Sequence, residues 1–375
     1  MKVLIVHPQM ALYGGAEIVI VKLAKYLQEH NHEVTILTLT SAHHDDYDGL
    51  DIIVPSFPEE RIQWRPRDGS LKTLHELYQI YKSLRYIVRE RVNGYDVVNV
   101  HNFPAIWAVP NNKPIVWMAN EIPDLWHNQK VPKLINPLLN IGRYGDRVIS
   151  NSKKPLTVVA DKRMRSLFEH RYGYRPEIVH YGVDSEFWNC EKQYEGFTVI
   201  VPSMITPSKR QMEILQAINT LEKHIPNLRV IFAGYKARTL YSFQLDKYIY
   251  DNSLRDIVSF TGMISREQLR ELYRKSSVAV LSGSGQGSWL GGFESLATGT
   301  PIIISPKLTC SEIVQSERLG IVSDNYVDNV LEIYTHQEHY HKQVKWQKEW
   351  VKENLTWDNY CKSMAEYMRI KLEYS

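Results

Sequence analysis

A glycine-rich stretch in the last third of the chain contains an acid suited to binding a ligand hydroxyl. It reads SGSGQGSWLGGFESLATGTPIIIS, beginning at Ser282, and the acid is Glu294. Glycine destabilises helices and strands, so such a dense run favours a loop whose bare backbone approaches a ligand. We expect Glu294 to open a short helix behind this loop, with the neutral Gln286 eight positions before it. A tight turn that caps the helix is the alternative.

Two further junctions between a predicted strand and a predicted helix carry groups that bind anions. Gly14 and Gly15 precede a helical pattern, where exposed N–H groups and the helix dipole favour a negative ligand. Lys209 and Arg210 can meet a diphosphate as a point charge and a guanidinium fork. A tight turn also explains the glycines, and solvated charge explains the cations. The glycine-rich loop and the Lys209 loop both follow carboxyl ends of strands in the second half of the chain, hence lie on one edge, and this convergence is stronger evidence than either loop alone.

The composition excludes several classes of protein. The chain has 375 residues, of which 43% are hydrophobic and 23% charged, as expected for one large or two medium domains. Its three cysteines have no metal-binding spacing, which favours a reducing compartment. The net charge of +3 is too small to indicate nucleic acid binding. Since no apolar run approaches the roughly 18 residues of a membrane span, we expect a cytoplasmic protein that is at most peripheral at a membrane.

The first half of the chain alternates between apolar strand patterns and amphipathic helix patterns. One helix is predicted from about Leu71 to Arg91. β-Branched runs that alternate with helices are typical of parallel sheets covered on both faces. The predicted strands are KVLIVHP (2–8), HEVTILTLT (32–40), DIIVP (51–55), DVVNVH (96–101), PIVWMA (114–119), DRVISNS (146–152) and PEIVHYGVD (176–184).

The same alternation restarts after a polar linker, Asn189–Gly196. Its predicted strands are FTVIVPS (197–203), LRVIFAG (228–234), IVSFTG (257–262), VAVLSG (278–283) and PIIIS (301–305). We therefore predict an α/β fold with two Rossmann-like, doubly wound domains, residues 1–188 and 196–350, that face one another across a cleft. A last helix is predicted at about 355–375.

With these residues in place, the chain resembles the GT-B glycosyltransferases of family 4 over nearly its whole length. The resemblance is carried by GGAEIVIVKLAKYLQEHNHEVTILT, YDVVNVHN and VSFTGMISREQLRELYRKSSVAVLSG, and most specifically by GGFESLATGTPIIIS. It implies a retaining enzyme that moves a hexose from a UDP- or GDP-linked donor to a glycan or lipid-linked acceptor. It also implies that no metal or cofactor is needed, and that the last helix packs back on the first domain.

The resemblance also assigns roles to single residues. Lys209 is implied to bind the diphosphate, with Arg210 beside it, and Glu294 to bind the ribose hydroxyls. His101 and Asn120 are implied on the acceptor side. The remaining donor contacts would come from backbone and loop positions, namely Gly14 and Gly15 near the phosphate, Gly262, Met263 and Ile264 at the base, and Gln286, Gly287, Ser288, Trp289, Leu290 and Gly291 at the sugar.

Two positions depart from the pattern of the family. Met204 stands where the family usually has an arginine, five positions before the lysine, and we hypothesise that Arg210 offsets this loss. Gln286 stands where the family usually has a first glutamate. An amide keeps hydrogen bonding but has no charge, which argues against an obligatory nucleophile here and suits assistance by the donor phosphate. A catalytically impaired nucleotide-sugar-binding or scaffold protein is the alternative.

Three other signals are weaker. Asp46 and Asp48 form a DxD pattern, but they lie in a polar loop, where we expect solvation and no metal. The basic, aromatic segments 61–72 and 161–175 are compatible with contact to an anionic membrane or with ordinary solvated faces. A nicotinamide oxidoreductase should have GxGxxG and an acid after its second strand, and the chain has neither.

Overall fold

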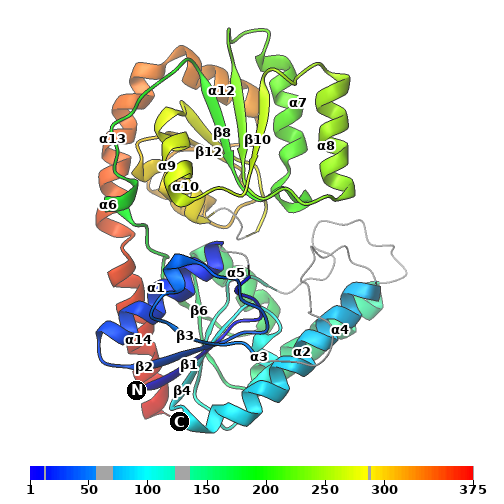
Figure 1. Ribbon diagram of the computed structural model, residues 1–375, viewed down its shortest axis with the longest axis vertical. Coiled ribbons are helices and arrows are strands. Elements are labelled where there is room, and N and C mark those ends of the chain that lie inside the picture. The colour runs from blue at the N-terminus through cyan, green and yellow to red at the C-terminus, as the bar shows by residue number, and fades with distance from the viewer. Residues whose placement is uncertain (12–13, 56–70, 123–135, 286–288, 375) are drawn as a thin grey trace. The chain divides into compact units, whose positions relative to one another are not determined.

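The computed structural model describes residues 1–11, 14–55, 71–122, 136–285 and 289–374 (Figure 1). The chain folds as two units. Unit 1 consists of residues 1–181 and 357–375, and unit 2 consists of residues 182–356. In each unit, strands and helices alternate along the chain, and the pairs between neighbouring strands are parallel.

The sheet of unit 1 has seven strands in the order β3-β2-β1-β4-β5-β6-β7. Most of these strands are short β-branched runs with buried side chains, which is why they pair in parallel in the middle of the unit. The strands are β1 (Lys2–Val6), β2 (Glu33–Leu37), β3 (Asp51–Ile53), β4 (Val97–His101), β5 (Ile115–Met118), β6 (Leu156–Val159) and β7 (Glu177–Ile178).

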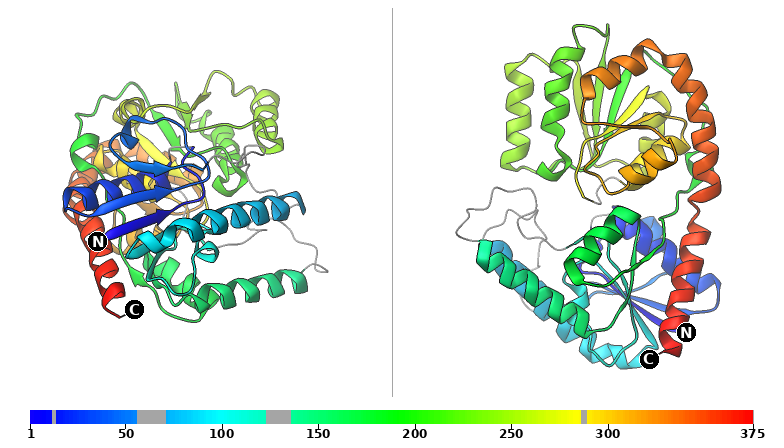
Figure 2. Two further views of the ribbon diagram at one scale, coloured as in Figure 1. Left: turned by 60° about the horizontal axis from the view of Figure 1, so that its bottom comes forward. Right: turned by 180° about the vertical axis from the view of Figure 1, so that it is seen from behind.

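Helices cover both faces of this sheet. Helices α1 (Gly15–Glu29) and α14 (Trp357–Glu373) pack against one another, and α14 also contacts β4 and β5. Figure 2 shows α14 and α1 together along the same side of the sheet. The hydrophobic core on the other face includes side chains from α2 (Leu71–Arg91), α3 (Ala105–Ala108) and α5 (Lys162–Tyr172).

The prediction of a strand at residues 146–152 is wrong, because these residues form the end of α4 (Asn136–Ser152). The strand of this region is β6, which the sequence analysis did not predict. Asp146 and Ser150 are buried one helical turn apart, and the Ser150 hydroxyl donates to Asp146 Oδ1 at 3.1 Å. Val148 and Ile149, which suggested a strand, are exposed on the helix surface. The buried polar pair four residues apart therefore fits a helix in this segment and does not fit the predicted strand.

The sheet of unit 2 has six strands in the order β10-β9-β8-β11-β12-β13. They are β8 (Thr198–Pro202), β9 (Arg229–Ala233), β10 (Val258–Gly262), β11 (Val278–Leu281), β12 (Ile302–Ile304) and β13 (Ile321–Val322). The helices of this unit are α6 (Ser185–Trp188), α7 (Gln211–Leu221), α8 (Leu240–Asp251), α9 (Arg266–Lys275), α10 (Trp289–Ala297), α11 (Ser311–Ser316), α12 (Tyr326–Thr335) and α13 (Gln337–Asn354).

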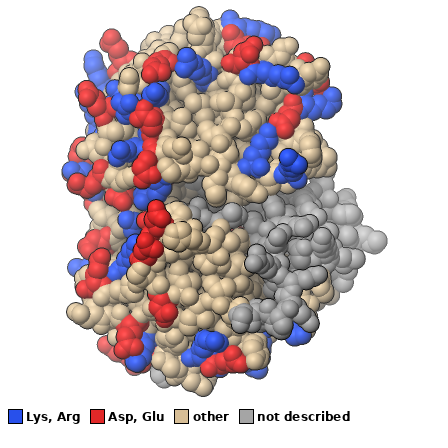
Figure 3. Space-filling view, in the orientation of Figure 1, with Lys and Arg blue, Asp and Glu red and all other residues tan. Residues whose placement is uncertain are grey.

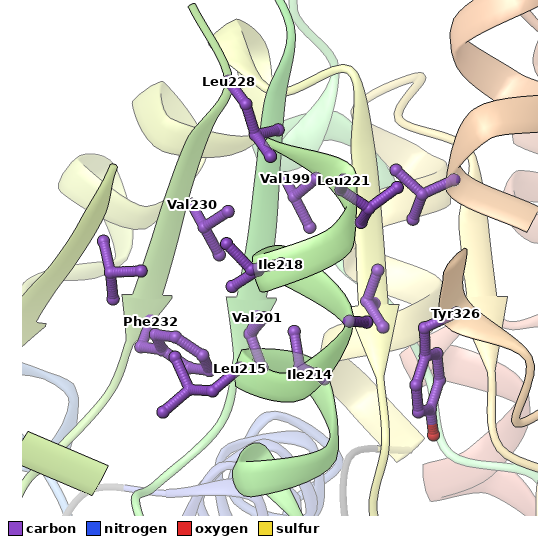
Figure 4. Packing of buried hydrophobic residues seen from close by; sticks show 14 of the residues in the cluster. Val199, Val201, Ile214, Leu215, Ile218, Leu221, Leu228, Val230, Phe232 and Tyr326 are labelled. Carbon is purple, nitrogen blue, oxygen red and sulfur yellow. The ribbon is translucent and has the colours of Figure 1, made fainter. Parts of the chain in front are cut away.

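Helix α7 shows how the core of unit 2 forms. Ile214, Ile218 and Leu221 recur at helical spacing and pack toward β8 and β9, where they meet Val199 and Val230 (Figure 4). These contacts fix the position of α7, and with it the end of the loop that connects β8 to α7. The loop between β8 and α7 is therefore held at both ends by buried apolar side chains.

In both sheets the chain adds its first three strands toward one edge and then adds the following strands toward the opposite edge. In unit 1 the change lies between β1 and β4, and in unit 2 between β8 and β11. In sheets of this kind, ligands bind beyond the carboxyl ends of the strands at such a switch point. The functional groups are therefore sought at these two edges.

Candidate functional site

Lys209 lies at the switch point of unit 2, in the loop between β8 and α7. Its alkyl chain passes Gly283, which follows β11, because a Cβ atom at Gly283 would come within 3.3 Å of Lys209 Cδ. The Ser282 hydroxyl donates to the Lys209 carbonyl oxygen at 2.6 Å. The two loops are thus tied together, and the glycine leaves room for the lysine.

Desolvation acts on the ammonium group of Lys209. Burial lowers its pKa to about 8, and the neighbouring Cys310 opposes this effect. The ammonium group has therefore lost part of its hydration, and it gains more from an anionic ligand than a fully solvated lysine would. This arrangement suits the phosphate contact predicted for Lys209.

Arg210 already has carboxylate partners in this structure. Its Nε donates to Glu213 Oε1 at 2.7 Å, and its Nη1 lies 3.3 Å from Asp324 Oδ1. Lys307 also contacts Asp324, at 3.2 Å. Arg210 thus links the loop after β8 to the segment after β13, and its charge is balanced there. A contact between Arg210 and a diphosphate, as predicted, would require it to exchange these partners.

The positions predicted to contact the base, Gly262, Met263 and Ile264, lie at the carboxyl end of β10. Gly262 is the last residue of β10 and has a φ of 70°, a left-handed conformation that favours glycine. Met263 is 56% exposed, and Ile264 is half-buried. The nearby Gly234 approaches the backbone of the β8 loop so closely that a Cβ atom there would lie 2.4 Å from Ser203 O. The ends of β8, β9 and β10 therefore converge.

The prediction that Glu294 opens its helix is wrong. Helix α10 begins at Trp289, so Glu294 lies in its second turn and Gly291 is helical. A Cβ atom at Gly291 would lie 3.4 Å from Pro202 O and 3.5 Å from the Tyr273 hydroxyl. These are ordinary contact distances, so packing alone does not require glycine at this position, and Gly291 is helical despite its low helix propensity. Trp289 and Leu290 are buried, while Gln286, Gly287 and Ser288 lie outside the described residues.

Glu294 is 8% exposed, and burial raises the pKa of its carboxyl group to about 7. The positive charge of Arg266 lowers this pKa, and the negative charge of Asp184 raises it. Such a carboxyl group is poised between its neutral and ionised forms near neutral pH. Ligand hydroxyl groups that donate to it would favour the carboxylate.

At the switch point of unit 1, His101 and Asn120 lie together, as their predicted common role requires. His101 is fully buried, and its Nε2 donates to Asn99 Oδ1 at 2.7 Å, since the Asn99 amide nitrogen donates to Val116 O. The Asn120 amide nitrogen lies 3.4 Å from His101 Nδ1. Burial holds the pKa of His101 well below its usual value, so this histidine is neutral. Asn120 is half-buried and nearer to solvent.

Glu17 and His7 are two residues of this edge that the sequence analysis missed. Glu17 Oε2 accepts from the Gly14 N–H at 3.0 Å, and Glu17 Oε1 lies 3.1 Å from Nε2 of the buried His7. The expectation that Gly14 presents its N–H to a ligand is therefore wrong, because the cap of α1 uses this group. Gly15 is exposed at the start of α1. Glu17 stands three positions after the N-cap, where the acid of a capping box stands, but Gly14 has no side chain to complete the reciprocal bond, so the sequence lacks the usual Ser or Thr signal.

Two kinds of feature were not found within the described residues. They contain no group of three or more His, Cys, Asp or Glu side chains arranged to hold a metal ion. In the same part of the chain, no helix has the length and apolar character of a membrane span.

On the face shown in Figure 3, Lys and Arg alternate with Asp and Glu along the side of α13, as on ordinary solvated surfaces.

Family models match both units of the chain. The model of glycosyltransferase family 4 matches residues 13–187, and that of the glycosyl transferases group 1 matches residues 184–350. The chain belongs to the family 4 glycosyltransferases. An uncharacterised glycosyltransferase of Methanocaldococcus jannaschii is 28% identical over 161 residues, which are 41% of this chain and 39% of that protein.

Solved structures of glycosyltransferases share the fold of this family member. HepE of Anabaena, in complex with UDP and glucose, has a TM-score of 0.76 at 14% identity and covers 98% of this chain and 99% of that one. Sucrose-phosphate synthase of Thermosynechococcus elongatus has a TM-score of 0.77 at 14% identity, with 100% of both chains covered. The similarity confirms the two Rossmann-like domains of a GT-B fold.

Proposed function

We propose that this glycosyltransferase transfers a hexose from a nucleotide-diphosphate sugar, UDP- or GDP-linked, to a hydroxyl group of a glycan or lipid-linked acceptor. The observation that carries the proposal is the arrangement of Lys209, Gly283 and Glu294 around the switch point of unit 2. The structures of HepE with UDP and with UDP-glucose support a nucleotide-sugar donor.

In this proposal the donor lies against the carboxyl edge of the unit 2 sheet. Lys209 neutralises the charge that develops on the diphosphate as its bond to the sugar breaks. The carboxylate of Glu294 accepts from the ribose hydroxyls, and the backbone around Gly262 contacts the base. His101 and Asn120 belong to the acceptor side, where the neutral His101 orients the Asn120 amide.

We further propose that transfer retains the anomeric configuration and needs no metal. The acceptor hydroxyl attacks the anomeric carbon on the face from which the diphosphate departs. The bond between that carbon and the phosphate oxygen breaks, and the hydroxyl proton passes to the departing phosphate. Gln286, an amide, fits this route because no protein carboxylate has to form a bond to the sugar. Changing Gln286 to Glu should then preserve or raise the rate, and complete loss would show that the amide is required.

A panel of nucleotide sugars tests the proposal. A ligand at 100 times its dissociation constant stabilises the folded protein by about 2.7 kcal/mol, so thermal unfolding reveals it. We expect UDP- or GDP-hexoses to raise the melting temperature and free hexoses to leave it unchanged. Mass spectrometry should then detect transfer of the sugar from the donor that binds. No stabilisation by any nucleotide sugar would contradict the proposal, and binding without transfer or donor hydrolysis would favour a scaffold role.

Peripheral membrane contact, which a lipid-linked acceptor would need, is a proposal for the surface of α4. Ile141, Tyr144 and Val148 share one face of this helix and are each at least 49% exposed, with the exposed cations Arg143 and Arg147 beside them. Such a surface suits an anionic lipid bilayer. Co-sedimentation with anionic vesicles should weaken at high salt and after a Tyr144→Ser substitution. Equal recovery with and without vesicles would exclude this contact.

A further inference from the structure

The chain passes from unit 1 to unit 2 through the tetrapeptide Tyr181–Asp184, which we call the crossing segment. Its middle is fixed by the Val183 N–H, which donates at 2.8 Å to the carbonyl oxygen of Leu355, just after α13. Its two end residues carry polar side chains that contact different groups. Each end reaches one of the two switch-point edges described above.

At the first end, Tyr181 positions the Asn120 amide. The Tyr181 hydroxyl donates to Asn120 Oδ1 at 2.7 Å, and the Tyr181 side chain is 5% exposed. The Asn120 amide nitrogen donates to Asn102 Oδ1 at 2.9 Å and lies 3.4 Å from His101 Nδ1. The tyrosine therefore fixes which side of the amide faces His101. Without its hydroxyl group, the amide oxygen would lose a buried donor.

At the second end, Asp184 faces the guanidinium group of Arg266. Its Oδ2 lies 3.8 Å from Arg266 Nη2, and the guanidinium group also lies over the Phe187 ring, 4.5 Å from its centre. The Arg266 Nε is buried without a hydrogen-bond partner in the described part of the chain, so the ion pair and the ring determine its position. Both Asp184 and Arg266 act on the charge of Glu294.

We propose that the crossing segment couples the two edges, with Tyr181 and Asp184 as positioning residues, so that nucleotide bound near Glu294 alters the order around Asn120. The inference rests on the proposed donor site. Nucleotide that favours the Glu294 carboxylate strengthens its attraction to Arg266, and Arg266 is shared with Asp184. A change in that ion pair reaches Tyr181 through three peptide units that Leu355 restrains, which provides a physical connection between the two edges.

Amide hydrogen exchange of residues 115–121, measured on the full chain with UDP or GDP at saturation, tests this coupling. In the unmodified protein we expect nucleotide to slow exchange in this segment by about fivefold or more, as for a coupling of ordinary strength. Tyr181→Phe and Asp184→Asn should both abolish the change while nucleotide still binds. An unchanged response in both variants, or no response in the unmodified protein with nucleotide bound, would overturn the coupling.

Two matched controls exclude a purely structural effect. Tyr360 is buried beside Tyr181, with ring centres 5.8 Å apart, and its hydroxyl has no hydrogen-bond partner in the described residues, so Tyr360→Phe should keep the response. Glu271 pairs with Arg274 on the same helix at 2.7 Å, so Glu271→Gln is the matched removal of a charge. Loss of the response in either control would point to general loosening and would also overturn the coupling.

The pH dependence of nucleotide binding separates the role of Asp184 from general damage. The described groups that act on the Glu294 carboxyl are Arg266 and Asp184, and Glu294 in turn raises the pKa of Tyr273. Because the charge of Asp184 raises the pKa of Glu294, Asp184→Asn should move the midpoint of nucleotide binding to lower pH. Arg266→Gln should move it to higher pH. Equal midpoints in all three proteins would contradict the role of Asp184. If the unmodified protein binds no nucleotide, the proposed function fails instead.

Discussion

The two sheets of this protein share one strand order, but the groups beyond their carboxyl ends differ. In unit 2 that edge holds glycines, several cations and a buried acid, with pKa values shifted toward neutrality at Lys209 and Glu294. In unit 1 the same edge holds the neutral, hydrogen-bonded side chains of His101 and Asn120, and the oxygens of its acid, Glu17, contact the Gly14 N–H and His7. The strand order thus determines where a site forms, and the side chains that follow the strands determine its chemistry. We assign the titrating, charged chemistry to unit 2.

Removal of the Lys209 charge should produce the largest difference between the two edges. If Lys209 stabilises charge on the diphosphate, Lys209→Ala should lower turnover on the order of a hundredfold, the usual effect of losing one such donor. Lys307, which is 54% exposed and also lies beyond a strand of unit 2, is the matched control, and Lys307→Ala should change turnover only slightly. Steady-state kinetics checks both variants. Similar turnover in the two variants would remove Lys209 from the mechanism.

The close approach of Gly234 to the backbone of the β8 loop predicts the second largest effect, on stability and nucleotide affinity. A Cβ atom at Gly234 would lie 2.4 Å from Ser203 O, so Gly234→Ala should destabilise the protein by about 2 kcal/mol through overpacking. It should also lower nucleotide affinity, because the β8 loop carries Lys209. Gly94→Ala in unit 1 is the control, since no atom lies within 4 Å of its Cβ position. Thermal unfolding measures both, and equal stability would show that this approach is not required.

The raised pKa of Glu294 predicts opposite effects on stability and binding. The folded protein holds this proton up to about pH 7, whereas an unfolded glutamate releases it near 4.3, so the stabilisation from this site is lost as pH rises through 7. Glu294→Gln should therefore raise the melting temperature more at pH 8 than at pH 4. The same variant should bind nucleotide about tenfold more weakly at pH 8. A lower melting temperature at pH 8 would contradict the assigned pKa direction.

The neutral His101 at the unit 1 edge predicts the smallest effect. Burial keeps His101 uncharged, so its substitution should not move the pH midpoint of nucleotide binding. We expect His101→Gln to reduce transfer while the midpoint stays near pH 7, where Glu294 titrates. Binding titrations across pH 5 to 9 would detect a change. A midpoint that moves with His101 would place titrating chemistry in unit 1 and break the contrast between the edges.

Much of the fold was predictable, because buried parallel strands are β-branched runs that stand out in the sequence. The family motifs placed Lys209 and Glu294 beyond such strands, as the structure has them. The start of α10 was not predictable from propensity, since glycine disfavours helices and Gly291 and Gly292 are nevertheless helical. The partners of Arg210 were also inaccessible, because Asp324 lies 114 positions away and reaches it only in the folded sheet.

The end of α4, residues 146–152, shows that a pair of adjacent apolar residues is not enough to predict a strand. Val148 and Ile149 suggested a strand, but two apolar residues fit a strand or a helix equally well. The buried contacts of Asp146 decide the matter, since it accepts from the Tyr172 hydroxyl at 2.8 Å and from Arg171 at 3.0 Å. Both partners come from α5, which the sequence alone does not place beside α4. Long-range polar contacts of this kind escape local patterns.

Amide hydrogen exchange of the whole chain, with and without a UDP- or GDP-hexose, tests the central claim most directly. The claim is that the carboxyl edge of the unit 2 sheet binds the nucleotide sugar. We predict protection in the segments that follow β8, β10 and β11, at residues 203–210, 262–265 and 282–285. Protection confined to other segments, or no protection at saturating ligand, would contradict the account.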